Sequence, residues 1–460
     1  MNDDSNIILL TDSYKPSHYM QLPPGLRYSF AFFESRGGVY PETLFFGLQP
    51  ILKKYFVGQV VTDEKIREAK ELFALHFGTS ANFNEAGWRY ILEEHGGRLP
   101  LEIRAIPEGT RVPNSNALMT VVNTDPEKTA WLGNYLETLL VQTWYPTTVA
   151  TQSYFMKKDI LRYLEETGTP EDIDFKLHDF GFRGSTSVES AGIGGAAHLV
   201  NFRGTDTIEA LLVAKNYYGE PMAGFSIPAS EHSTITSWGR ERELDAYRNM
   251  LKQFPKGIVA VVSDSYDIYE ACDKLWGSEL KTKVLNRDGV LVIRPDSGNP
   301  VEVLPKVLEI LGSRFGYTMN TKNFKVLNPK VRLIQGDGID RNSVPTIYEC
   351  LKAHAWSADN LNLGSGGGLL QKVDRDTQKF AFKCSAVEID GTWRGVMKDP
   401  VTDHGKRSKA GRLALIKEEG TYRTVQVEEA QGQNELVPVF RNGELLVDQA
   451  FADIRKRALA

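Results

Sequence analysis

Seven short polar clusters in the middle of the chain contain residue types that bind phosphate, hold a divalent cation or move protons. Each follows a short apolar run, and the clusters are residues 178–184, 203–206, 230–233, 263–265, 294–298, 336–340 and 364–368. Glycine lets backbone N–H groups approach phosphate oxygens, arginine grips them, and carboxylates hold Mg²⁺ through oxygen. One such cluster more often only forms a turn and caps the next helix, but seven together favour a site for an anionic, phosphate-bearing ligand with Mg²⁺.

The glycine-rich segment 364–368 is the strongest phosphate signal. It precedes Leu369 and Leu370 at an expected helix start, where N–H donors are unpaired. The sequence contains no GxxxxGK[ST], which excludes a P-loop. Residues 192–197 match GxGxxA, but residues 186–190 before them do not form a convincing buried strand. We therefore reject a Rossmann nucleotide site.

His232 has the clearest chemical context among the histidines. Glu231 precedes it, and hydroxyl side chains surround it at positions 230, 233 and 234. An imidazole that a carboxylate orients can act as a base or as a nucleophile, including as a phosphoryl acceptor. A surface or helix-capping histidine explains the same pattern equally well. No HxH or HExxH spacing supports a metal role for histidine.

The apolar runs before these clusters predict strands over residues 175–177, 199–202, 224–227, 258–262, 290–293, 331–334 and 361–363. Helical patterns lie between them, for example over residues 267–276, ended by Gly277, and over residues 301–311, ended by Gly312. Continuous apolar strands that alternate with helices are typical of a parallel sheet covered on its faces. The number of units favours a (β/α) barrel over an open doubly wound sheet.

The two ends of the chain have a different pattern. The first part mixes a helix over residues 64–77 with strands over 101–106 and 118–122, and the last part predicts a β meander. The meander strands are residues 379–387, 422–427 and 436–440, with turns at Asp390-Gly391 and Asn442-Gly443. We predict an α/β protein in which residues 146–379 form a barrel-like domain and residues 1–145 with 380–460 form a second, α+β domain.

Charge and cysteine content narrow the class of protein. The 460 residues carry 54 Lys+Arg against 59 Asp+Glu, a net charge of −5, which argues against a dedicated nucleic-acid or membrane binder. The three cysteines are far apart, so neither a disulfide framework nor a CxxC metal site is expected. The N-terminus has no signal-peptide pattern, and no apolar run approaches membrane-spanning length. We expect a cytoplasmic protein with neither a nucleic-acid nor a membrane partner.

Several of these motifs occur in a fixed order that resembles one family. They are residues 11–15, 177–184, 231–234, 263–267, 293–298, 336–338 and 364–368. Together they resemble the type II phosphoribosyltransferases, and among these the nicotinamide phosphoribosyltransferases, from about residue 6 to residue 456. The resemblance implies that nicotinamide and phosphoribosyl pyrophosphate give nicotinamide mononucleotide and pyrophosphate, with Mg²⁺, in NAD biosynthesis. It also implies ATP hydrolysis through a phosphohistidine, and a homodimer with active sites at its interface.

The resemblance implies a role for each matching position. Phe180 would stack on one face of the nicotinamide ring and Tyr14 of the partner subunit on the other, and Asp206 would accept a hydrogen bond from the carboxamide. The phosphoribosyl group would meet Arg183, Arg294, Asp296, Gly336, Asp337, Gly338, Gly367, Gly368 and Arg375. Lys398 and Lys406, in a basic loop that is otherwise an ordinary solvated loop, would meet the phosphates. His232 would be the phosphorylated residue, oriented by Asp264, with Glu231 beside it. The Mg²⁺ ligands stay open.

Two alternatives to nicotinamide transfer remain at this point. A nicotinate phosphoribosyltransferase would have the same fold, but a buried carboxylate at Asp206 would repel the nicotinate anion and favour the neutral amide. A non-catalytic binding protein on the same scaffold is the other alternative. The presence of His232, Asp206, Arg294 and Asp296 argues against it.

Overall fold

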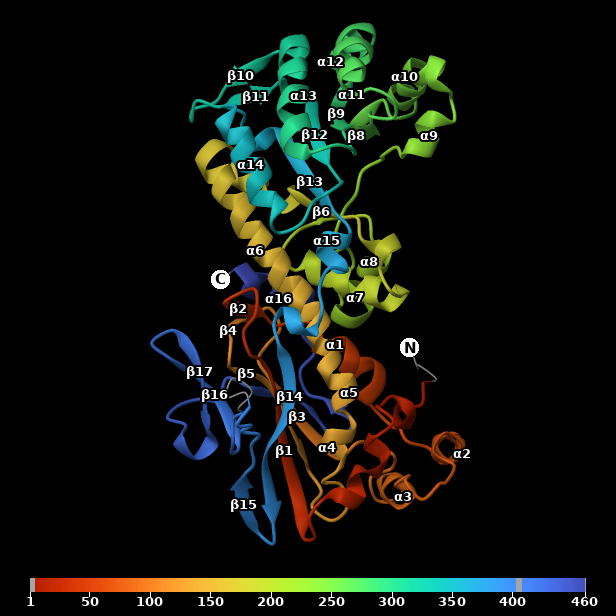
Figure 1. The fold of residues 1–460 in the computed structure, drawn as a ribbon, viewed down its shortest axis with the longest axis vertical. Helices are drawn as coiled ribbons and strands as arrows, with labels where there is room; N and C mark the ends of the chain where they lie inside the picture. Colours follow the sequence, from red (N-terminus) through yellow and green to blue (C-terminus); the bar gives the residue numbers. More distant parts are fainter. Residues whose placement is uncertain (1–4, 403–407, 460) are drawn as a thin grey trace. The chain divides into compact units, whose positions relative to one another are not determined.

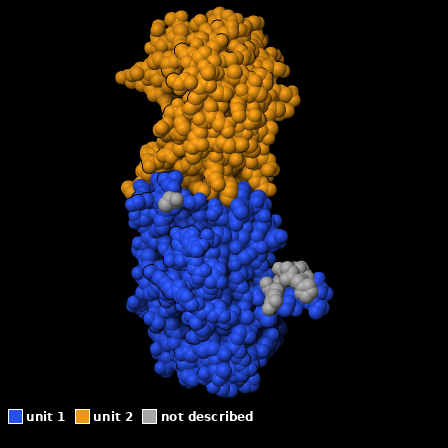
Figure 2. All heavy atoms as spheres, turned by 90° about the vertical axis from the view of Figure 1, so that its left-hand side faces the viewer, with its two compact units in different colours: residues 1–151, 216–220, 374–460 blue, residues 152–215, 221–373 orange. Residues whose placement is uncertain are grey.

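A computed structural model of the chain describes residues 5–402 and 408–459. The chain divides into two compact units, which Figure 2 distinguishes by colour. Unit 1 comprises Met1–Thr151, Asn216–Glu220 and Asp374–Ala460, and unit 2 comprises Gln152–Lys215 and Pro221–Val373. The domain boundaries drawn from the sequence, after residue 145 and before residue 380, stay a prediction.

Unit 2 is built on a six-stranded sheet in the order β7-β6-β13-β12-β9-β8, in which all neighbours are parallel. The strands are β6 (Leu177–Asp179), β7 (Gly204–Thr205), β8 (Lys256–Val262), β9 (Asp288–Arg294), β12 (Val331–Gln335) and β13 (Leu361–Ser365). Phe225 forms a parallel bridge to β7, and Ala229 forms one to β8. Residues 225–229 therefore contact both edge strands. The predicted α/β class with a barrel-like domain is confirmed.

Helices connect the strands of this sheet in the manner of βαβ units (Figure 1). They are α6 (Trp144–Thr167), α7 (Val188–Leu199), α8 (Ile208–Tyr218), α9 (His232–Thr236), α10 (Glu243–Gln253), α11 (Ile268–Glu270), α12 (Lys281–Asn286), α13 (Pro300–Phe315), α14 (Ser343–Ala353) and α15 (Gly367–Leu370). A π-helical stretch, Ala271–Glu279, continues α11, and a small hairpin of β10 (Tyr317–Met319) and β11 (Lys325–Leu327) follows α13.

The strands predicted at residues 258–262, 290–293, 331–334 and 361–363 are confirmed, whereas the one at 199–202 is wrong. That apolar run is the end of α7 and a turn, and the strand follows it as β7. A short apolar run does not distinguish a buried helix from a strand. The helix packs closely on α8 at Gly195, where an added Cβ would lie 2.7 Å from the Cβ of Ala210. The prediction at 175–177 is displaced to β6, and residues 224–227 make only an isolated bridge.

Two predicted helix ends are also wrong. The helix expected to stop at Gly312 continues to Phe315 and ends at Gly316, which has a φ of 85°. Gly312 is instead a packing position, since a Cβ there would lie 2.8 Å from the Trp356 ring. The helix expected to stop at Gly277 likewise runs on as the π-helical stretch.

Unit 1 contains a seven-stranded sheet in the order β15-β14-β1-β5-β3-β18-β19, with antiparallel neighbours. Its strands are β1 (Leu26–Ser35), β3 (Leu101–Ala105), β5 (Ala117–Asn123), β14 (Phe380–Ile389), β15 (Thr392–Gly395), β18 (Val437–Arg441) and β19 (Glu444–Leu445). Both ends of the chain thus supply strands to one sheet, and β1 lies beside β14 in Figure 1. The predicted α+β domain built from both chain ends is confirmed.

The remaining elements of unit 1 pack around this sheet or form small hairpins. The helices are α1 (Leu48–Ile51), α2 (Asp63–Phe77), α3 (Glu85–Glu94), α4 (Leu132–Tyr135), α5 (Glu137–Leu140) and α16 (Phe451–Leu459). The hairpins pair β2 (Glu42–Leu44) with β4 (Arg111–Pro113), and β16 (Leu413–Glu418) with β17 (Thr421–Gln426). Asp390-Gly391 and Asn442-Gly443 have positive φ at both positions, as the predicted hairpin turns require. Within the described residues, no helix has the length and apolar composition needed to span a membrane.

Candidate active site

A cavity of about 710 Å³ in unit 2 gathers residues that follow strands of the parallel sheet. The carboxyl ends of parallel strands meet at one edge of a sheet, so loops from distant parts of the chain converge there. The predicted site residues that line the cavity are Phe180, Arg183, Asp206, Glu231, Arg294, Asp296, Gly336, Asp337, Gly338, Gly367 and Gly368. The structure therefore brings together most of the residues selected from sequence. Thr207, Gln371 and Lys372 also line the cavity.

Phe180 is held between the ends of β6 and β13. Its backbone N–H donates to the carbonyl of Ser365 at 2.9 Å. The next N–H, of Gly181, donates to the carboxylate of Asp179 at 2.7 Å. The aromatic ring lies against the backbone of β13, because a Cβ built on Gly364 would stand 1.9 Å from the Phe180 Cε2 atom. Phe180 thus forms a flat apolar wall that depends on glycine at position 364.

Two aspartates beside this ring are in contrasting environments. Asp179 is fully buried, and burial raises the pKa of its carboxyl to about 6, with the negative charge of Asp206 as a smaller cause. Asp206 itself is exposed at the cavity, and its Oδ1 atom accepts the hydroxyl hydrogen of Ser226 at 2.5 Å. The expectation that Asp206 is buried is wrong for the single chain. Its charge is therefore partly screened by water, and its other oxygen has room for a ligand donor.

Arg294 and Asp296 follow β9 and face the same cavity. The Arg294 side chain is only 16% exposed, and its Nη2 atom lies 3.6 Å from the Asp296 Oδ2 atom. The Arg294 Nε atom is buried and has no hydrogen-bond partner among the residues that the structure describes. Burial raises the pKa of the Asp296 carboxyl, and the nearby carboxylates of Asp264 and Asp337 add to the increase while Arg294 opposes it. The arrangement combines an unused guanidinium donor with a concentration of acidic groups.

His232 begins α9, and its partner is Asp264 rather than the adjacent Glu231. The His232 Nε2 atom lies 3.0 Å from Oδ1 of Asp264, whose side chain is 3% exposed, while the imidazole is 46% exposed. Glu231 is occupied in the first turn of α9, where its carboxylate accepts the Ser233 hydroxyl and its N–H donates to Thr234. The Asp264 contact fixes Nε2 as the bound nitrogen and leaves Nδ1 as the nitrogen available for chemistry.

Two glycine-containing loops form another wall of the cavity. They are the loops of residues 336–339 and 366–368. The two loops are in close contact, as a Cβ added to Gly368 would lie 2.3 Å from the carbonyl oxygen of Ile339. The predicted helix start after Gly366 is present, but α15 has only four residues, so its dipole is weak. Gln371 follows, and its side-chain amide donates to the Gly181 carbonyl at 3.0 Å. The packing of the loops, rather than a long helix, brings backbone groups to the cavity.

The other predicted residues belong to unit 1. Tyr14 is 60% exposed, and the chain beneath it is fixed by the buried Lys15, whose amino group donates to the Asn134 carbonyl at 2.7 Å and contacts Glu137 at 2.9 Å. Arg375 and Lys398 are both exposed. Lys406 lies outside the described residues.

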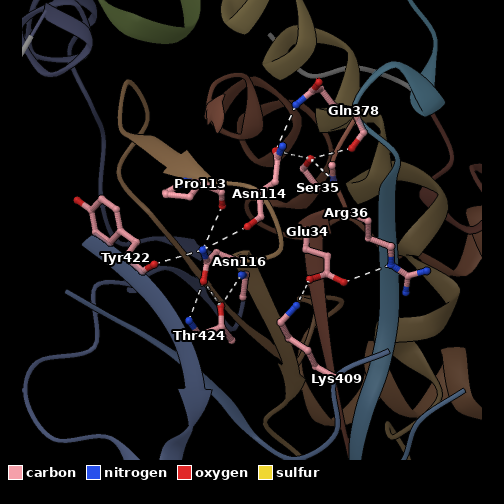
Figure 3. Close-up of polar contacts among 12 residues, drawn as sticks. Glu34, Ser35, Arg36, Pro113, Asn114, Asn116, Gln378, Lys409, Tyr422 and Thr424 are labelled. Atoms are coloured by element: carbon pink, nitrogen blue, oxygen red, sulfur yellow. Dashed lines mark hydrogen bonds and ion pairs between the residues drawn. The ribbon is translucent and has the colours of Figure 1, made fainter. Parts of the chain in front are cut away.

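Arg375 and Lys398 are part of a basic cluster, which we define as Arg36, Arg375, Lys383 and Lys398. Burial lowers the pKa of Lys383, the carboxylate of Glu137 opposes this decrease, and the positive charges of the other three add to it. Glu34 lies next to this cluster and binds two cations: Arg36 Nε at 3.2 Å and the amino group of Lys409 (Figure 3). The Ser35 hydroxyl, which is also drawn there, donates to the Gln378 carbonyl at 2.7 Å. The cluster would attract an anion.

Two family models match the chain. One, described as the nicotinate phosphoribosyltransferase (NAPRTase) family, matches residues 175–444, and the other, the N-terminal domain of nicotinamide phosphoribosyltransferase, matches residues 6–103. The chain belongs to the nicotinate phosphoribosyltransferase family. It is accordingly an enzyme of the phosphoribosyltransferase class.

Relatives within this family are similar over nearly the whole chain. A protein of Xanthomonas campestris pv. campestris named nicotinamide phosphoribosyltransferase is 53% identical over 464 residues, which cover 98% of both chains. A protein of the same name from Acinetobacter baylyi is 32% identical over 97% of this chain and 95% of its own.

Two solved structures share the fold at low identity. The nicotinate-nucleotide pyrophosphorylase of Pyrococcus furiosus superposes with a TM-score of 0.63 at 16% identity, over 100% of this chain and 96% of that chain. Human nicotinic acid phosphoribosyltransferase gives a TM-score of 0.61 at 15% identity, over 98% of this chain and 93% of that chain.

Sequence reasoning missed several residues that the structure places at the cavity, beside Asp206 or in the basic cluster. Gln371 and Lys372 directly follow Leu370, so extending the glycine motif by two residues would have found them. Ser226, the partner of Asp206, gave no signal, because its role depends on a contact across 20 residues of chain. Lys383 lies inside the apolar strand β14, where a lysine is itself a signal that was overlooked.

Proposed function

We propose that the chain transfers the phosphoribosyl group of phosphoribosyl pyrophosphate to nicotinamide and so supplies nicotinamide mononucleotide for NAD biosynthesis. The bond from the anomeric carbon to the pyrophosphate oxygen breaks, and a bond from that carbon to the ring nitrogen of nicotinamide forms. The observation that carries the proposal is one cavity that combines a flat aromatic wall at Phe180, a carboxylate at Asp206 and guanidinium groups at Arg183 and Arg294. The names of the two relatives described above support the choice of base.

The base binds beside Phe180 in this proposal. A neutral pyridine ring stacks on the Phe180 face, and its carboxamide N–H donates to the Asp206 oxygen that Ser226 does not occupy. Nicotinate has no such donor and carries a negative charge. Asp206 therefore favours the amide by offering an acceptor and by repelling the acid.

Replacement of Asp206 by asparagine tests this preference. We expect the ratio of kcat/KM for nicotinamide to kcat/KM for nicotinate to fall about tenfold, because the repulsion of an exposed charge is worth roughly one power of ten at most. Steady-state rates with the two bases at saturating phosphoribosyl pyrophosphate measure the ratio. Ser226→Ala is the matched control, since it removes the hydroxyl partner of Asp206 but keeps the charge.

Three results would contradict this part of the proposal. An unchanged ratio in Asp206→Asn would mean that the carboxylate does not select the base. A wild-type enzyme that uses nicotinate as well as nicotinamide, or better, would make the chain a nicotinate phosphoribosyltransferase, and a chain that binds both substrates without turnover would be a binding protein.

The phosphate-bearing substrate occupies the opposite part of the cavity in our proposal. Arg294 has a buried Nε–H without a partner in the described part of the chain, and a phosphate oxygen can accept its hydrogen. Arg183, Lys372 and the backbone around Gly336–338 and Gly367–368 line the same space. Negative charge grows on pyrophosphate as it leaves, so fixed cations at these positions stabilise the transition state more than the ground state.

The acidic residues of the cavity fit a Mg²⁺ ion held chiefly by the substrate. Within the described residues, no group of three or more His, Cys, Asp or Glu side chains is arranged to hold a metal ion. Mg²⁺ commonly takes only one or two protein carboxylates and completes its coordination with phosphate oxygens and water. Asp296 and Asp337 would hold the Mg²⁺ ion. Burial and the neighbouring acidic groups raise the pKa of Asp296. The bound ion would supply positive charge to the pyrophosphate oxygens.

His232 serves as the phosphoryl acceptor in this proposal. The Asp264 contact holds Nε2, so the free Nδ1 lone pair attacks the terminal phosphorus of ATP and ADP leaves with the bond electrons. Water later takes the phosphoryl group from nitrogen and releases inorganic phosphate. The nitrogen–phosphorus bond is thereby made and broken within each cycle, and its energy can shift substrate affinity or product release.

A homodimer would complete the site with unit 1 of a second copy. The exposed Tyr14 side chain rests on a rigid base at Lys15, and the basic cluster presents cations at the surface of unit 1. Both features suit a role toward another subunit's ligands. Sedimentation equilibrium at the enzyme concentrations used in assays is expected to give twice the chain mass of 51.5 kDa. A fully active monomer would refute the shared site.

A further inference from the structure

One buried carboxylate joins the candidate phosphoryl acceptor to the loop that carries Asp296. Oδ1 of Asp264 lies 3.0 Å from His232 Nε2. Oδ2 of the same group accepts the backbone N–H of Asp296 at 2.9 Å and the hydroxyl hydrogen of Ser297 at 2.5 Å. The side chain of Asp264 is 3% exposed, so its oxygens are directed to these contacts rather than to solvent. Three loops of the parallel sheet therefore meet on a single planar group.

A shared acceptor makes the two sides of the contact interdependent. A carboxylate is rigid and planar, so a rotation that improves the bond to the imidazole changes the geometry at Asp296 and Ser297. The negative charge of the Asp264 carboxylate is also shared between its two oxygens. When the donor on one oxygen becomes positive, it attracts more of this charge, and the hydrogen bonds to the other oxygen weaken. Phosphorylation at Nδ1 changes the charge of the imidazole in this way. Asp296 lines the cavity, so its position reports the change to the substrate.

We propose that Ser297 is a positioning residue that couples the state of His232 to the position of Asp296. The inference rests on the proposed function where it links this coupling to the use of ATP. The Ser297 hydroxyl does not touch the cavity and acts only through Asp264. It supplies the second contact that fixes the carboxylate on the Asp296 side. Without the Ser297 hydroxyl, the backbone N–H of Asp296 would be the remaining contact between this loop and Oδ2 of Asp264.

A first test needs no substrate. In amide hydrogen exchange of the full-length enzyme, we expect the peptide that contains Asp296 to exchange at least about threefold faster in both Ser297→Ala and His232→Ala, because each variant removes one support of the shared carboxylate. Ser265→Ala is the matched control, since Ser265 lies on the loop of Asp264 but its buried hydroxyl has no hydrogen-bond partner within residues 5–402 and 408–459. An unchanged or slower rate in His232→Ala overturns the inference, whatever reaction the enzyme catalyses.

A second test measures coupling in the assay. We define the coupling ratio as the KM for phosphoribosyl pyrophosphate without ATP divided by the KM with ATP. We expect Ser297→Ala to bring this ratio to within about twofold of one, and Ser297→Thr, which keeps a hydroxyl, to restore the wild-type ratio. A merely structural role would raise both KM values together and leave the ratio unchanged, and that result overturns the inference.

The two failures are distinguishable. A wild-type enzyme without phosphoribosyl transfer or without an ATP effect counts against the proposed function, and the exchange experiment then decides on the Asp264 contact alone. Thermal unfolding of each variant checks that it is folded. If Ser297→Ala does not fold, Ser297→Thr against Ser297→Val gives the same comparison, with and without a hydroxyl on a β-branched side chain.

Discussion

Gly364→Ala is expected to lower kcat/KM for nicotinamide about a hundredfold, because a displacement of about 1 Å at a reacting group commonly has an effect of that size. An alanine methyl group at position 364 would stand 1.9 Å from Cε2 of Phe180, which is far inside van der Waals contact. The ring must then leave β13 and enter the cavity. In the proposed binding mode the ring faces the base and not the phosphates, so the effect should appear mainly in the KM for the base.

A second variant separates this mechanism from general damage to the barrel. Leucine is smaller than phenylalanine and leaves room at position 364. In a Phe180→Leu background, the Gly364→Ala change should therefore lower kcat/KM for nicotinamide by less than about tenfold. Such non-additivity is expected for residues in contact. Steady-state kinetics on the four proteins, with thermal unfolding as a check on folding, complete the cycle. Equal costs in the two backgrounds would show that Phe180 is not the group displaced.

His232→Ala is expected to abolish ATP stimulation while a measurable rate of phosphoribosyl transfer remains. The methyl side chain has no nitrogen to accept a phosphoryl group, whereas Phe180, Asp206 and Arg294 still line the cavity. Transfer should then run with the weaker substrate affinity of the ATP-free enzyme. The measurement is nicotinamide mononucleotide formation with and without ATP, together with acid-labile label on the protein after incubation with γ-labelled ATP.

The control for His232→Ala is His232→Asn, which can still donate to Asp264 but cannot become a phosphohistidine. It should lose stimulation to the same extent as alanine. If it is stimulated like the wild type, or if wild-type label resides elsewhere, the phosphoryl acceptor is a different residue.

The central strands of the barrel could be predicted from sequence because their signal is local. The strand at residues 290–293 is a continuous apolar run that ends in Arg294, and β9 covers it. The run at 199–202 is also apolar except for Asn201, yet it closes a helix, since a short apolar run does not distinguish a helix end from a strand. Gly312 was taken as a helix end for the same reason, although a ring 44 residues further along the chain, that of Trp356, requires a glycine there.

The candidate site followed the same division. The residues that line the cavity could be selected from sequence, because loops after parallel strands converge whatever their detailed conformation. Their partners could not. The exposure of Asp206 and its bond to Ser226 depend on where residues 225–229 lie between β7 and β8. The bonds of Asp264 to Asp296 and Ser297 likewise join loops of two neighbouring strands, and sequence spacing carries no trace of them.

The stretch that touches both edge strands of the barrel has a consequence for how new specificities could arise. Ser226, which orients Asp206, and His232 are only six positions apart on this stretch, between the bridges at Phe225 and Ala229 and the start of α9. In the proposed function, a swap of this stretch between family members would change the hydroxyl partner of Asp206 and the phosphoryl acceptor together. Asp206 itself and the sheet that supports the stretch would stay the same.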